Sequence, residues 1–308
     1  MFDAKAFIDD AVKKIRADIG GGKAIIGLSG GVDSSVAAVL THKAVGANLV
    51  SIFVDTGFMR KGEADEIKKT FEGKFHLNFR LVDAGKEFMK ELNGVSDPEE
   101  KRKIIGHKFI EVFERHAKKE KAKCLVQGTI APDWIETGGK IKSHHNVTLP
   151  HGMKLKIVEP LRELYKDEVR IVARKLGLPE EISERMPFPG PGLAVRVVGE
   201  ITPEKVDLVR EADAIVKDEV DKARLKSWQA FAVLLEGKVT GVKGDSRDYG
   251  HMICVRIVDS LDAMTANAQE VDWKILRKIA DRIPRELPKV TRVLYDLTNK
   301  PPATIEFE

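Results

Sequence analysis

The feature that most constrains this chain is a loop of glycines and serines between an apolar run and a helix-forming segment. The apolar run, 24–28, comes shortly after three glycines, and the loop from Ser29 to Ser35 reads Ser-Gly-Gly-Val-Asp-Ser-Ser. In a strand–loop–helix unit, glycines let backbone N–H groups approach an anion, and the helix N-terminus adds a favourable dipole. The loop therefore predicts a phosphate-binding site at the end of a buried strand.

The side chains of this loop indicate how a phosphate is held. Ser29, Ser34 and Ser35 carry hydroxyl groups that can donate hydrogen bonds to phosphate oxygens. Asp33 repels phosphate directly, so its presence is explained if Mg²⁺ lies between its carboxylate and the phosphates. The Walker A pattern and the dinucleotide-binding pattern are both absent. The simpler alternative, a serine-capped helix after a glycine turn, is disfavoured by the full seven-residue pattern.

Strands and helices alternate through the N-terminal half of the chain. Strands are predicted at 24–28, 49–54, 79–82 and 124–126, and helices at 2–19, 34–45, 63–71 and 98–119. This alternation predicts an α/β fold with a doubly wound parallel sheet, in which ligands bind at the carboxyl ends of the strands. Ser29, Asp55 and Gly128 each fall at a strand end, so we expect them to share one pocket.

The second half of the chain follows a different pattern. A long polar segment, 131–156, is expected to be a functional loop, and a helix is predicted at 166–176. Pro-Phe-Pro-Gly-Pro-Gly at 187–192 then ends regular structure, so we divide the chain into domains of residues 1–188 and 189–308. The second is predicted to be a smaller α+β domain, with helices at 203–219 and 273–283 and strands at 231–235, 252–258 and 290–297.

Composition narrows the classes of function. The net charge of +4, from 52 basic and 48 acidic residues, gives no indication of a nucleic-acid partner. Cys124 and Cys254 lie in apolar runs and form no Cys-x-x-Cys pair, which disfavours a zinc site or a redox dithiol. No apolar stretch reaches the roughly 20 residues of a membrane helix, and no signal pattern opens the chain, so we expect a cytoplasmic protein.

The loop from Ser29 to Ser35 resembles the PP-loop of the N-type ATP pyrophosphatases, which split ATP between its α- and β-phosphates. The resemblance implies the adenine nucleotide alpha hydrolase-like fold. Further segments narrow it to the ATP-pyrophosphatase part of the GMP synthetases, from the first helix to the last residue. These segments are Val54–Gly57, Asp97–Gly106, Gln127–Thr129, Ile141–Val147, Pro187–Gly192 and Lys300–Glu306.

The resemblance implies a ligase reaction in two steps. The purine O2 of xanthosine monophosphate (XMP) attacks the α-phosphate of Mg·ATP, which gives adenyl-XMP and pyrophosphate. Ammonia then attacks C2, and GMP and AMP are released. ATP and Mg²⁺ are thus expected, the first as a substrate.

The resemblance also implies ATP-site residues, several of which have simpler alternatives. The ATP-binding candidates are Ser29, Gly30, Gly31, Val32, Asp33, Ser34, Ser35, Val54 and Gly128, and the catalytic candidates are Asp133, Glu136, Lys142 and Lys166. Asp133 and Glu136 are candidates for Mg²⁺ handling, although their spacing alone fits solvated loop charges equally well. Lys142 and Lys166 are expected at the ATP phosphates, where the alternative is an ordinary solvated lysine. We reject a metal site at the two adjacent histidines, 144–145, because no third ligand has a suitable spacing.

The expected XMP site lies mostly in the second domain. The family's substrate-binding positions correspond to Arg102, Gln229, Arg292, Lys300, Ile305 and Glu306. The cations among them suit the phosphate of XMP. The segment from Thr304 to Phe307 alternates as a docked edge strand does, whereas the alternative is a frayed tail.

Two partners are expected. Neither cysteine stands in the Gly-x-Cys-x-Gly setting of a glutamine amidotransferase nucleophile, and the chain begins directly at the ATP module, so we expect a separate glutaminase subunit. The resemblance further implies a homodimer formed through the C-terminal domain. Three rival interpretations remain: an NAD synthetase, a sulfur-transferring tRNA enzyme, and a non-catalytic ATP-binding sensor. Pyrophosphate release separates the sensor from the enzymes.

Overall fold

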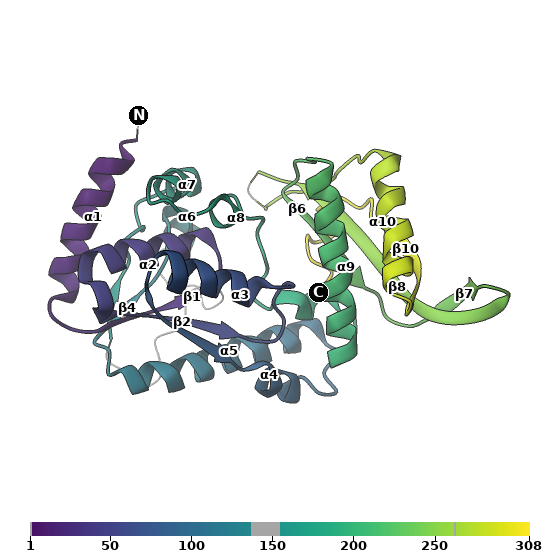
Figure 1. Cartoon of the computed structure of the whole chain (residues 1–308), viewed down its shortest axis with the longest axis horizontal. Helices are drawn as coiled ribbons and strands as arrows, with labels where there is room; N and C mark the ends of the chain where they lie inside the picture. The colour runs from purple at the N-terminus through teal and green to yellow at the C-terminus, as the bar shows by residue number, and fades with distance from the viewer. Residues whose placement is uncertain (1, 137–154, 262) are drawn as a thin grey trace. The chain divides into compact units, whose positions relative to one another are not determined.

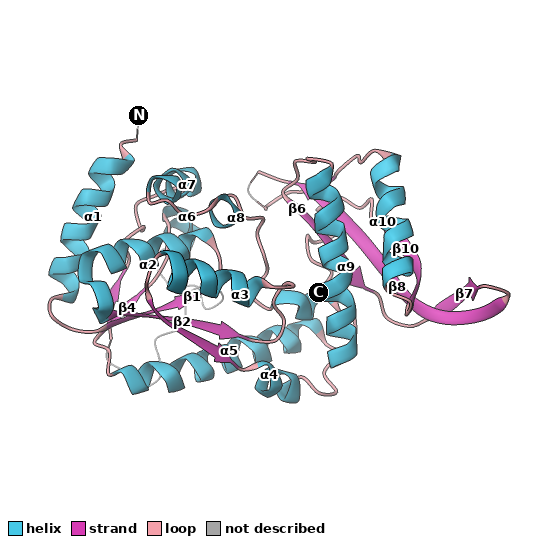
Figure 2. Ribbon diagram, in the orientation of Figure 1, coloured by secondary structure: helices cyan, strands magenta, loops and turns pink. Residues whose placement is uncertain are grey.

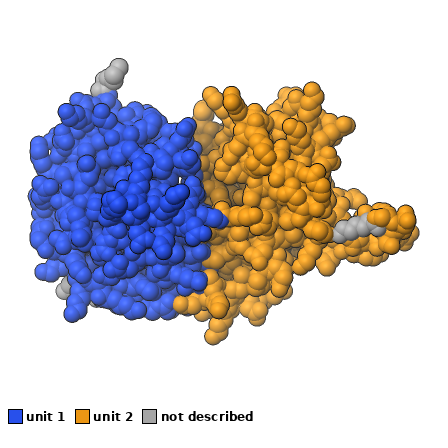
Figure 3. All heavy atoms as spheres, viewed as in Figure 1, with its two compact units in different colours: residues 1–56, 62–84, 106–185 blue, residues 57–61, 85–105, 186–308 orange. Residues whose placement is uncertain are grey.

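The computed structural model describes residues 2–136, 155–261 and 263–308 and divides them into two compact units (Figure 3). The first unit comprises residues 1–56, 62–84 and 106–185, and the second comprises 57–61, 85–105 and 186–308. The chain passes from the first unit to the second for the last time between Arg185 and Met186. The second unit also takes two segments from the N-terminal half of the chain, which the division into 1–188 and 189–308 did not include.

The first unit is built on a parallel sheet of five strands, in the order β3-β2-β1-β4-β5 (Figure 2). The strands are β1 (Ala24–Leu28), β2 (Leu49–Asp55), β3 (Asn78–Asp83), β4 (Cys124–Val126) and β5 (Lys156–Val158). Every neighbouring pair runs parallel. The residues of β1 and β2 are almost all buried, as expected for strands covered on both faces. The predicted doubly wound parallel sheet is confirmed.

Helices cover both faces of this sheet (Figure 1). They are α1 (Ala4–Ile19), α2 (Val32–Val45), α3 (Glu63–Lys68), α5 (Pro98–Glu120), α6 (Ala131–Glu136), α7 (Lys166–Lys175) and α8 (Glu180–Ser183). Asp3 caps α1 by accepting hydrogen bonds from the first backbone N–H groups, and Ile8, Ile15 and Ile19 form its buried face. Phe113 of α5 packs against Gly27 of β1, where a Cβ would lie 3.3 Å from the ring.

The second unit is an α+β structure, as predicted. Its main sheet has the order β10-β8-β6, with β6 antiparallel and β10 parallel to β8. A hairpin of β7 with the first half of β8 extends from this sheet (Figure 1). The elements are α4 (Gly85–Glu91), α9 (Pro203–Lys222), β6 (Gln229–Leu234), β7 (Val239–Lys243), β8 (Ser246–Asp259), β9 (Asn267–Ala268), α10 (Trp273–Glu286) and β10 (Val290–Tyr295). Arg282 joins the two long helices by pairing with Asp218 and Glu219.

The chain after β10 corrects one prediction. The expected edge strand at Thr304–Phe307 is wrong, because residues 301–308 form turns and irregular structure. Pro301 and Pro302 have no N–H group to donate to a strand partner. The carbonyl oxygens of Thr304 and Ile305 instead accept hydrogen bonds from Arg256, at 2.8 and 2.9 Å.

No helix within residues 2–136, 155–261 and 263–308 is both long and apolar enough to cross a lipid bilayer.

The proline-rich turn ends on a glycine whose replacement tests this packing. Gly192 has a φ of +66°, and a Cβ there would overlap the carbonyl oxygen of Phe58 and lie 3.0 Å from its Cβ. Gly177 also has a positive φ, of +80°, but no atom lies within 4 Å of its Cβ position. We expect Gly177→Ala to lower the free energy of unfolding by about 1–2 kcal/mol, the cost of the backbone conformation. Gly192→Ala should cost roughly 1–3 kcal/mol more, because of the clash.

Urea unfolding of the two variants beside the unchanged chain measures the difference. If the two variants lose the same free energy of unfolding, the contact between Gly192 and Phe58 does not resist an added methyl group, and the prediction is wrong.

Candidate active site

The predicted pocket residues of the first unit meet at one edge of the sheet. Ser29 follows β1 directly, Asp55 ends β2, and Gly128 lies two residues beyond β4. Because β2, β1 and β4 are adjacent and parallel, these three ends lie side by side. The order of strands reverses direction between β1 and β4, which is the switch point where open α/β sheets bind ligands.

The loop after β1 is shaped by hydrogen bonds among its own residues. The Ser34 hydroxyl accepts from the Ser29 backbone N–H at 3.2 Å and lies 3.0 Å from the Ser29 hydroxyl. The Ser29 hydroxyl also accepts from the N–H of Gly31 at 3.3 Å, and Gly30 takes a positive φ of +77°. Ser35 is fully buried, and its hydroxyl donates to the Gly31 carbonyl at 2.7 Å. Ser35 therefore shapes the loop from within.

The helix that follows begins without a side-chain cap. Val32 is the first residue of α2, and Gly31, its N-cap, makes no side-chain hydrogen bond to it. The N–H groups of a first helical turn have no partner within the helix, so they need an acceptor from elsewhere. An anion at the loop supplies one, and the helix dipole favours it there. Val54, the remaining ATP candidate, is buried within β2.

Gly128 brings the chain after β4 against this loop. A Cβ at Gly128 would lie 2.9 Å from both the carbonyl carbon of Asp33 and the backbone nitrogen of Ser34. Any side chain there would push the two backbones apart. The sequence prediction that Gly128 shares a pocket with the loop thus has a direct steric basis.

Asp33 and Lys166 form the ion pair at this edge. The Lys166 ammonium, at the start of α7, lies 2.6 Å from Asp33 Oδ2. Asp33 Oδ1 is buried and has no hydrogen-bond partner among the described residues. Burial raises the pKa of Asp33 above its ordinary value, although Lys166 acts in the opposite direction, and the nearby Asp133 raises the pKa further.

Of the three catalytic candidates in the segment 131–156, the structure describes the side chain of Asp133 alone. Its Oδ2 accepts a hydrogen bond from the backbone N–H of Ile130 at 3.2 Å, at the start of α6. The side chain of Glu136 and the whole of Lys142 lie outside the described residues, as do His144 and His145. In the described parts of the chain, no three histidine, cysteine, aspartate or glutamate side chains are grouped closely enough to hold a metal.

Three charged residues support the loop and were not predicted. Arg185 donates to the carbonyl of Gly30 at 3.2 Å and lies 3.2 Å from the carboxylate of Glu63, which is almost fully buried. Arg170, one turn after Lys166 on α7, interacts electrostatically with Asp33. Its spacing of four residues from Lys166 was a usable signal, because such residues share a helix face. Arg185 and Glu63 gave no signal, since they are far apart in the sequence.

In the second unit, the structure brings Gln229 and Glu306 together. The Glu306 carboxylate is held by Arg196, with Nε to Oε2 and Nη2 to Oε1 both at 3.0 Å. Gln229 Nε2 donates to the Pro187 carbonyl at 2.8 Å and lies 3.5 Å from Glu306 Oε1. Gln229 Oε1 is buried, and no donor among the described residues reaches it. The cluster is therefore rich in acceptors.

The other XMP candidates are spread along the same unit. Ile305 packs beside the buried cluster of Phe231, Val233 and Cys254. Arg102 donates to the backbone oxygen of Glu308, and Lys300 donates to the carbonyl of Ala263 at 2.8 Å. Arg292 is exposed on β10. The final residues are thus not a frayed tail, because Arg196, Arg256 and the residues at 101–102 hold them.

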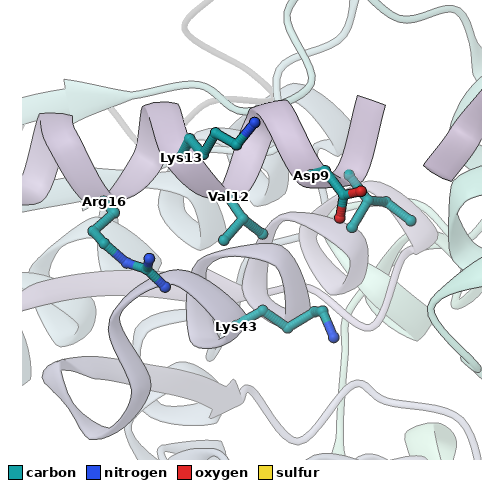
Figure 4. A pocket seen from close by; sticks show the side chains of 6 residues that line it. Asp9, Val12, Lys13, Arg16 and Lys43 are labelled. Carbon is teal, nitrogen blue, oxygen red and sulfur yellow. The ribbon is translucent and has the colours of Figure 1, made fainter. Parts of the chain in front are cut away.

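A surface pocket elsewhere in the first unit is unrelated to these residues. It lies between α1 and α2 (Figure 4) and is lined by Ile8, Asp9, Val12, Lys13, Arg16 and Lys43. The guanidinium of Arg16 joins α1 to α2, because its Nε donates to the carbonyl of Ala44 at 3.0 Å. None of the predicted site residues lines this pocket.

The buried carboxylate predicts how stability depends on pH. Because folding raises the pKa of Asp33 above 3.8, its contribution to stability is present below that pH and is lost as the pH rises through the folded-state pKa. We therefore expect Asp33→Asn to gain stability relative to the unchanged chain as the pH rises from about 4 to 7. Unfolding free energies of both proteins across this range measure the difference, in which the other titrating groups cancel.

Lys166→Met provides the matched test. It removes the cation that lowers the pKa of Asp33, so the decline with pH should be larger than in the unchanged chain. A difference of the opposite sign in either variant would mean that the ion pair outweighs burial.

Two protein families match this chain, one in each half of the sequence. Residues 216–307 match the family described as "GMP synthase C terminal domain", and residues 20–194 match "Thiamine biosynthesis protein (ThiI)". Among solved structures, NMN synthetase from Francisella tularensis aligns with a TM-score of 0.49 and 17% identity, over 67% of this chain and 85% of that one.

Curated relatives match along the whole length. The chain is 64% identical to the B subunit of glutamine-hydrolysing GMP synthase from Methanopyrus kandleri and 63% identical to that of Methanocaldococcus jannaschii, with 100% of each chain covered. It is 65% identical to the Thermococcus kodakarensis protein of the same name, over 98% of this chain and 99% of that one. The resemblance predicted from the PP-loop and the Lys300–Glu306 segment is confirmed, and the chain belongs to the family of glutamine-hydrolysing GMP synthase B subunits.

Proposed function

We propose that this chain is the ligase that converts XMP to GMP, with ATP as the activating substrate and ammonia as the nitrogen donor. The observation that carries the proposal is the uncapped loop Ser29–Ser35 at the switch point of the sheet, in a chain 63–65% identical throughout to proteins named for GMP synthesis. The purine O2 of XMP attacks the α-phosphate of ATP and pyrophosphate leaves. Ammonia then replaces AMP at C2.

The first unit supplies what the adenylation step needs. Negative charge grows on the leaving pyrophosphate, and fixed donors that face this charge lower the barrier. The backbone N–H groups of the first turn of α2 are such donors, and Ser29 and Ser34 add hydroxyl groups. Lys166 adds a mobile cation once a ligand releases it from Asp33.

The residues present fit a bound Mg²⁺. Asp33 Oδ1 is buried and has no partner among the described residues, which suits a ligand awaiting a cation. Mg²⁺ takes only one or two carboxylates from such sites and leaves the remaining positions to phosphate oxygens and water. When bound, the ion would offset the phosphate charge. Asp33 is the proposed ligand, and Asp133 is near enough to influence its charge.

Glu136 and Lys142 belong to the proposal through the family resemblance alone. We assign Glu136, with Asp133, to Mg²⁺ handling and adenylation, and Lys142 to the ATP phosphates. If the segment 131–156 excludes water, it would protect the adenylate from hydrolysis.

The second unit is proposed to bind XMP. Glu306 Oε2 accepts from Arg196 and keeps a second lone pair, and Gln229 Oε1 has no donor among the described residues. A purine base with N–H groups supplies donors. Ile305 adds an apolar contact, while Arg102, Arg292 and Lys300 are candidate cations for the phosphate of XMP. The division of labour between residues 1–188 and 189–308 remains part of this proposal.

Two partners complete it. The relatives are each named as one part of a glutamine-hydrolysing synthase, which implies a second polypeptide. We propose that this second polypeptide is a glutaminase that supplies ammonia. We also propose a homodimer formed through residues 189–308.

The function predicts a specific requirement for substrates. With Mg·ATP, XMP and ammonium chloride, the chain alone should release pyrophosphate and GMP in equal amounts. Omission of XMP, or its replacement by deamido-NAD, should abolish pyrophosphate release, because no acceptor oxygen then fits the second unit. Asp33→Asn should lose most of this activity while remaining folded. Coupled pyrophosphate detection and chromatography of the nucleotides measure both products.

Each rival gives a different result. Release with deamido-NAD would indicate an NAD synthetase, and ATP binding without turnover under any condition would indicate the sensor. Glutamine in place of ammonium should give no GMP until a glutaminase is added. GMP formation from glutamine by the chain alone would overturn the proposed partner.

A further inference from the structure

Arg196 is held in one orientation by contacts on three sides. It ends the 3₁₀ helix Gly192–Arg196 and is only 1% exposed. One edge of its guanidinium makes the two 3.0 Å hydrogen bonds to Glu306, which is the bidentate geometry that only arginine provides. Its Nη1 donates to Asp213 Oδ1 at 3.1 Å, and the rings of Phe231 and Phe188 lie 4.2 and 5.1 Å from its central carbon.

Asp213, which holds Arg196, is itself fixed by the sheet. The residue is buried on α9, and the same Oδ1 accepts the backbone N–H of Ala232 in β6 at 3.2 Å. The position of Arg196 is therefore set by a helix and a strand, independently of the final residues of the chain. Glu306 docks onto a site that these elements already form.

The charges of this group leave an excess of acceptors. Two carboxylates share one guanidinium, so the trio carries a net charge of about −1 in ionised form. Arg196 donates to each oxygen of Glu306, and Gln229 Nε2 also donates to Oε1. A carboxylate has about four lone-pair positions, so the free position is on Oε2. Oε2 can therefore accept a hydrogen bond from a ligand. Gln229 Oε1, which no donor in the described part of the chain reaches, belongs to the same cluster.

A purely structural role would not favour this arrangement. Replacing a buried ion pair by apolar residues of similar size is often neutral or stabilising, so burial of three charges is weak support for a stability function. A carboxylate held in one orientation, however, discriminates strongly between ligands with and without N–H donors. The Glu306 side chain is 11% exposed, whereas that of Arg196 is 1% exposed. A ligand therefore meets the carboxylate and not the arginine.

We propose that Arg196 is a positioning residue, which with Asp213 holds the Glu306 carboxylate oriented to accept N–H groups of the XMP base. This inference rests on the proposed function, in which Glu306 contacts XMP.

A double-mutant cycle in the ammonium-dependent assay tests it. Glu306→Gln should raise the KM for XMP about tenfold to a hundredfold, the range expected for a hydrogen bond to a charged group. Arg196→Lys keeps the charge but loses the bidentate contact, and should raise the same KM to a similar extent while the KM for ATP stays unchanged. The double variant should be no worse than Glu306→Gln alone, because Arg196 acts through Glu306.

Two further variants keep the test decisive. Asp213→Asn leaves Arg196 and Glu306 intact, so it should give a smaller rise in the KM for XMP that also disappears in the Glu306→Gln background. Arg282→Lys is the matched control. It loosens the ion pairs between α9 and α10, and should lower thermal stability without changing the KM for XMP.

The outcomes separate the two levels of inference. If the unchanged chain makes no GMP from XMP, the proposed function fails. If it does, but Arg196→Lys and Asp213→Asn leave the KM for XMP unchanged, the positioning role is overturned. Effects that add to that of Glu306→Gln would equally overturn it, since they would reveal general loosening of the fold.

Discussion

The backbone contact between Gly128 and the loop after β1 is the constraint on which the first unit depends. Parallel pairing of β4 with β1 places Gly128 at the carboxyl edge of the sheet, beside Asp33 and Ser34. Because no side chain intervenes, the loop has a rigid wall on one side and the start of α2 on the other. Ser35 and Arg185 then fix the loop by donating to the backbone carbonyls of Gly31 and Gly30. The helix N-terminus is thus aimed before any ligand arrives, which lowers the ordering cost of binding.

The second unit solves a different problem, that of holding a chain segment with no regular structure. Three buried cations hold it. Arg256 binds the carbonyls of Thr304 and Ile305, Arg196 binds Glu306, and Lys101 pairs with Glu308 while donating to the Val197 carbonyl at 2.9 Å. The two bonds from Arg256 satisfy backbone carbonyls that a strand partner would otherwise bind, and the other two cations hold side-chain carboxylates. Irregular backbone can therefore present specific side chains without fraying.

Elements marked by a contiguous sequence pattern could be predicted, and elements without one could not. Both bounds of β1 and the start of β4 were predicted to the residue, because short apolar runs between glycine and polar residues mark buried strands. The three-residue β5 and the polar hairpin strand β7 were missed, since neither has a run long enough to show alternation. The expected edge strand at Thr304–Phe307 failed because alternation says nothing about whether a backbone partner is present.

The site residues divide in the same way. The loop Ser29–Ser35 is one contiguous motif, and the Lys300–Glu306 segment is another, so both could be found without coordinates. Arg196 was missed because its partner Glu306 is 110 residues away and only the fold brings them together. Arg185 and Glu63 are likewise joined only through tertiary structure. Residues that position others carry no local chemical pattern of their own.

The two sites treat a buried carboxylate in opposite ways, and the difference matches their proposed ligands. Burial outweighs the compensation that Lys166 gives Asp33, and one of its oxygens lacks any partner in the described part of the chain. A cation that arrives with its ligand can recover this unfavourable energy as binding energy. Both oxygens of Glu306, by contrast, already accept a hydrogen bond from Arg196 before any ligand binds. Glu306 needs no further cation, and so the remaining lone pair on Oε2 can select a base by its N–H group.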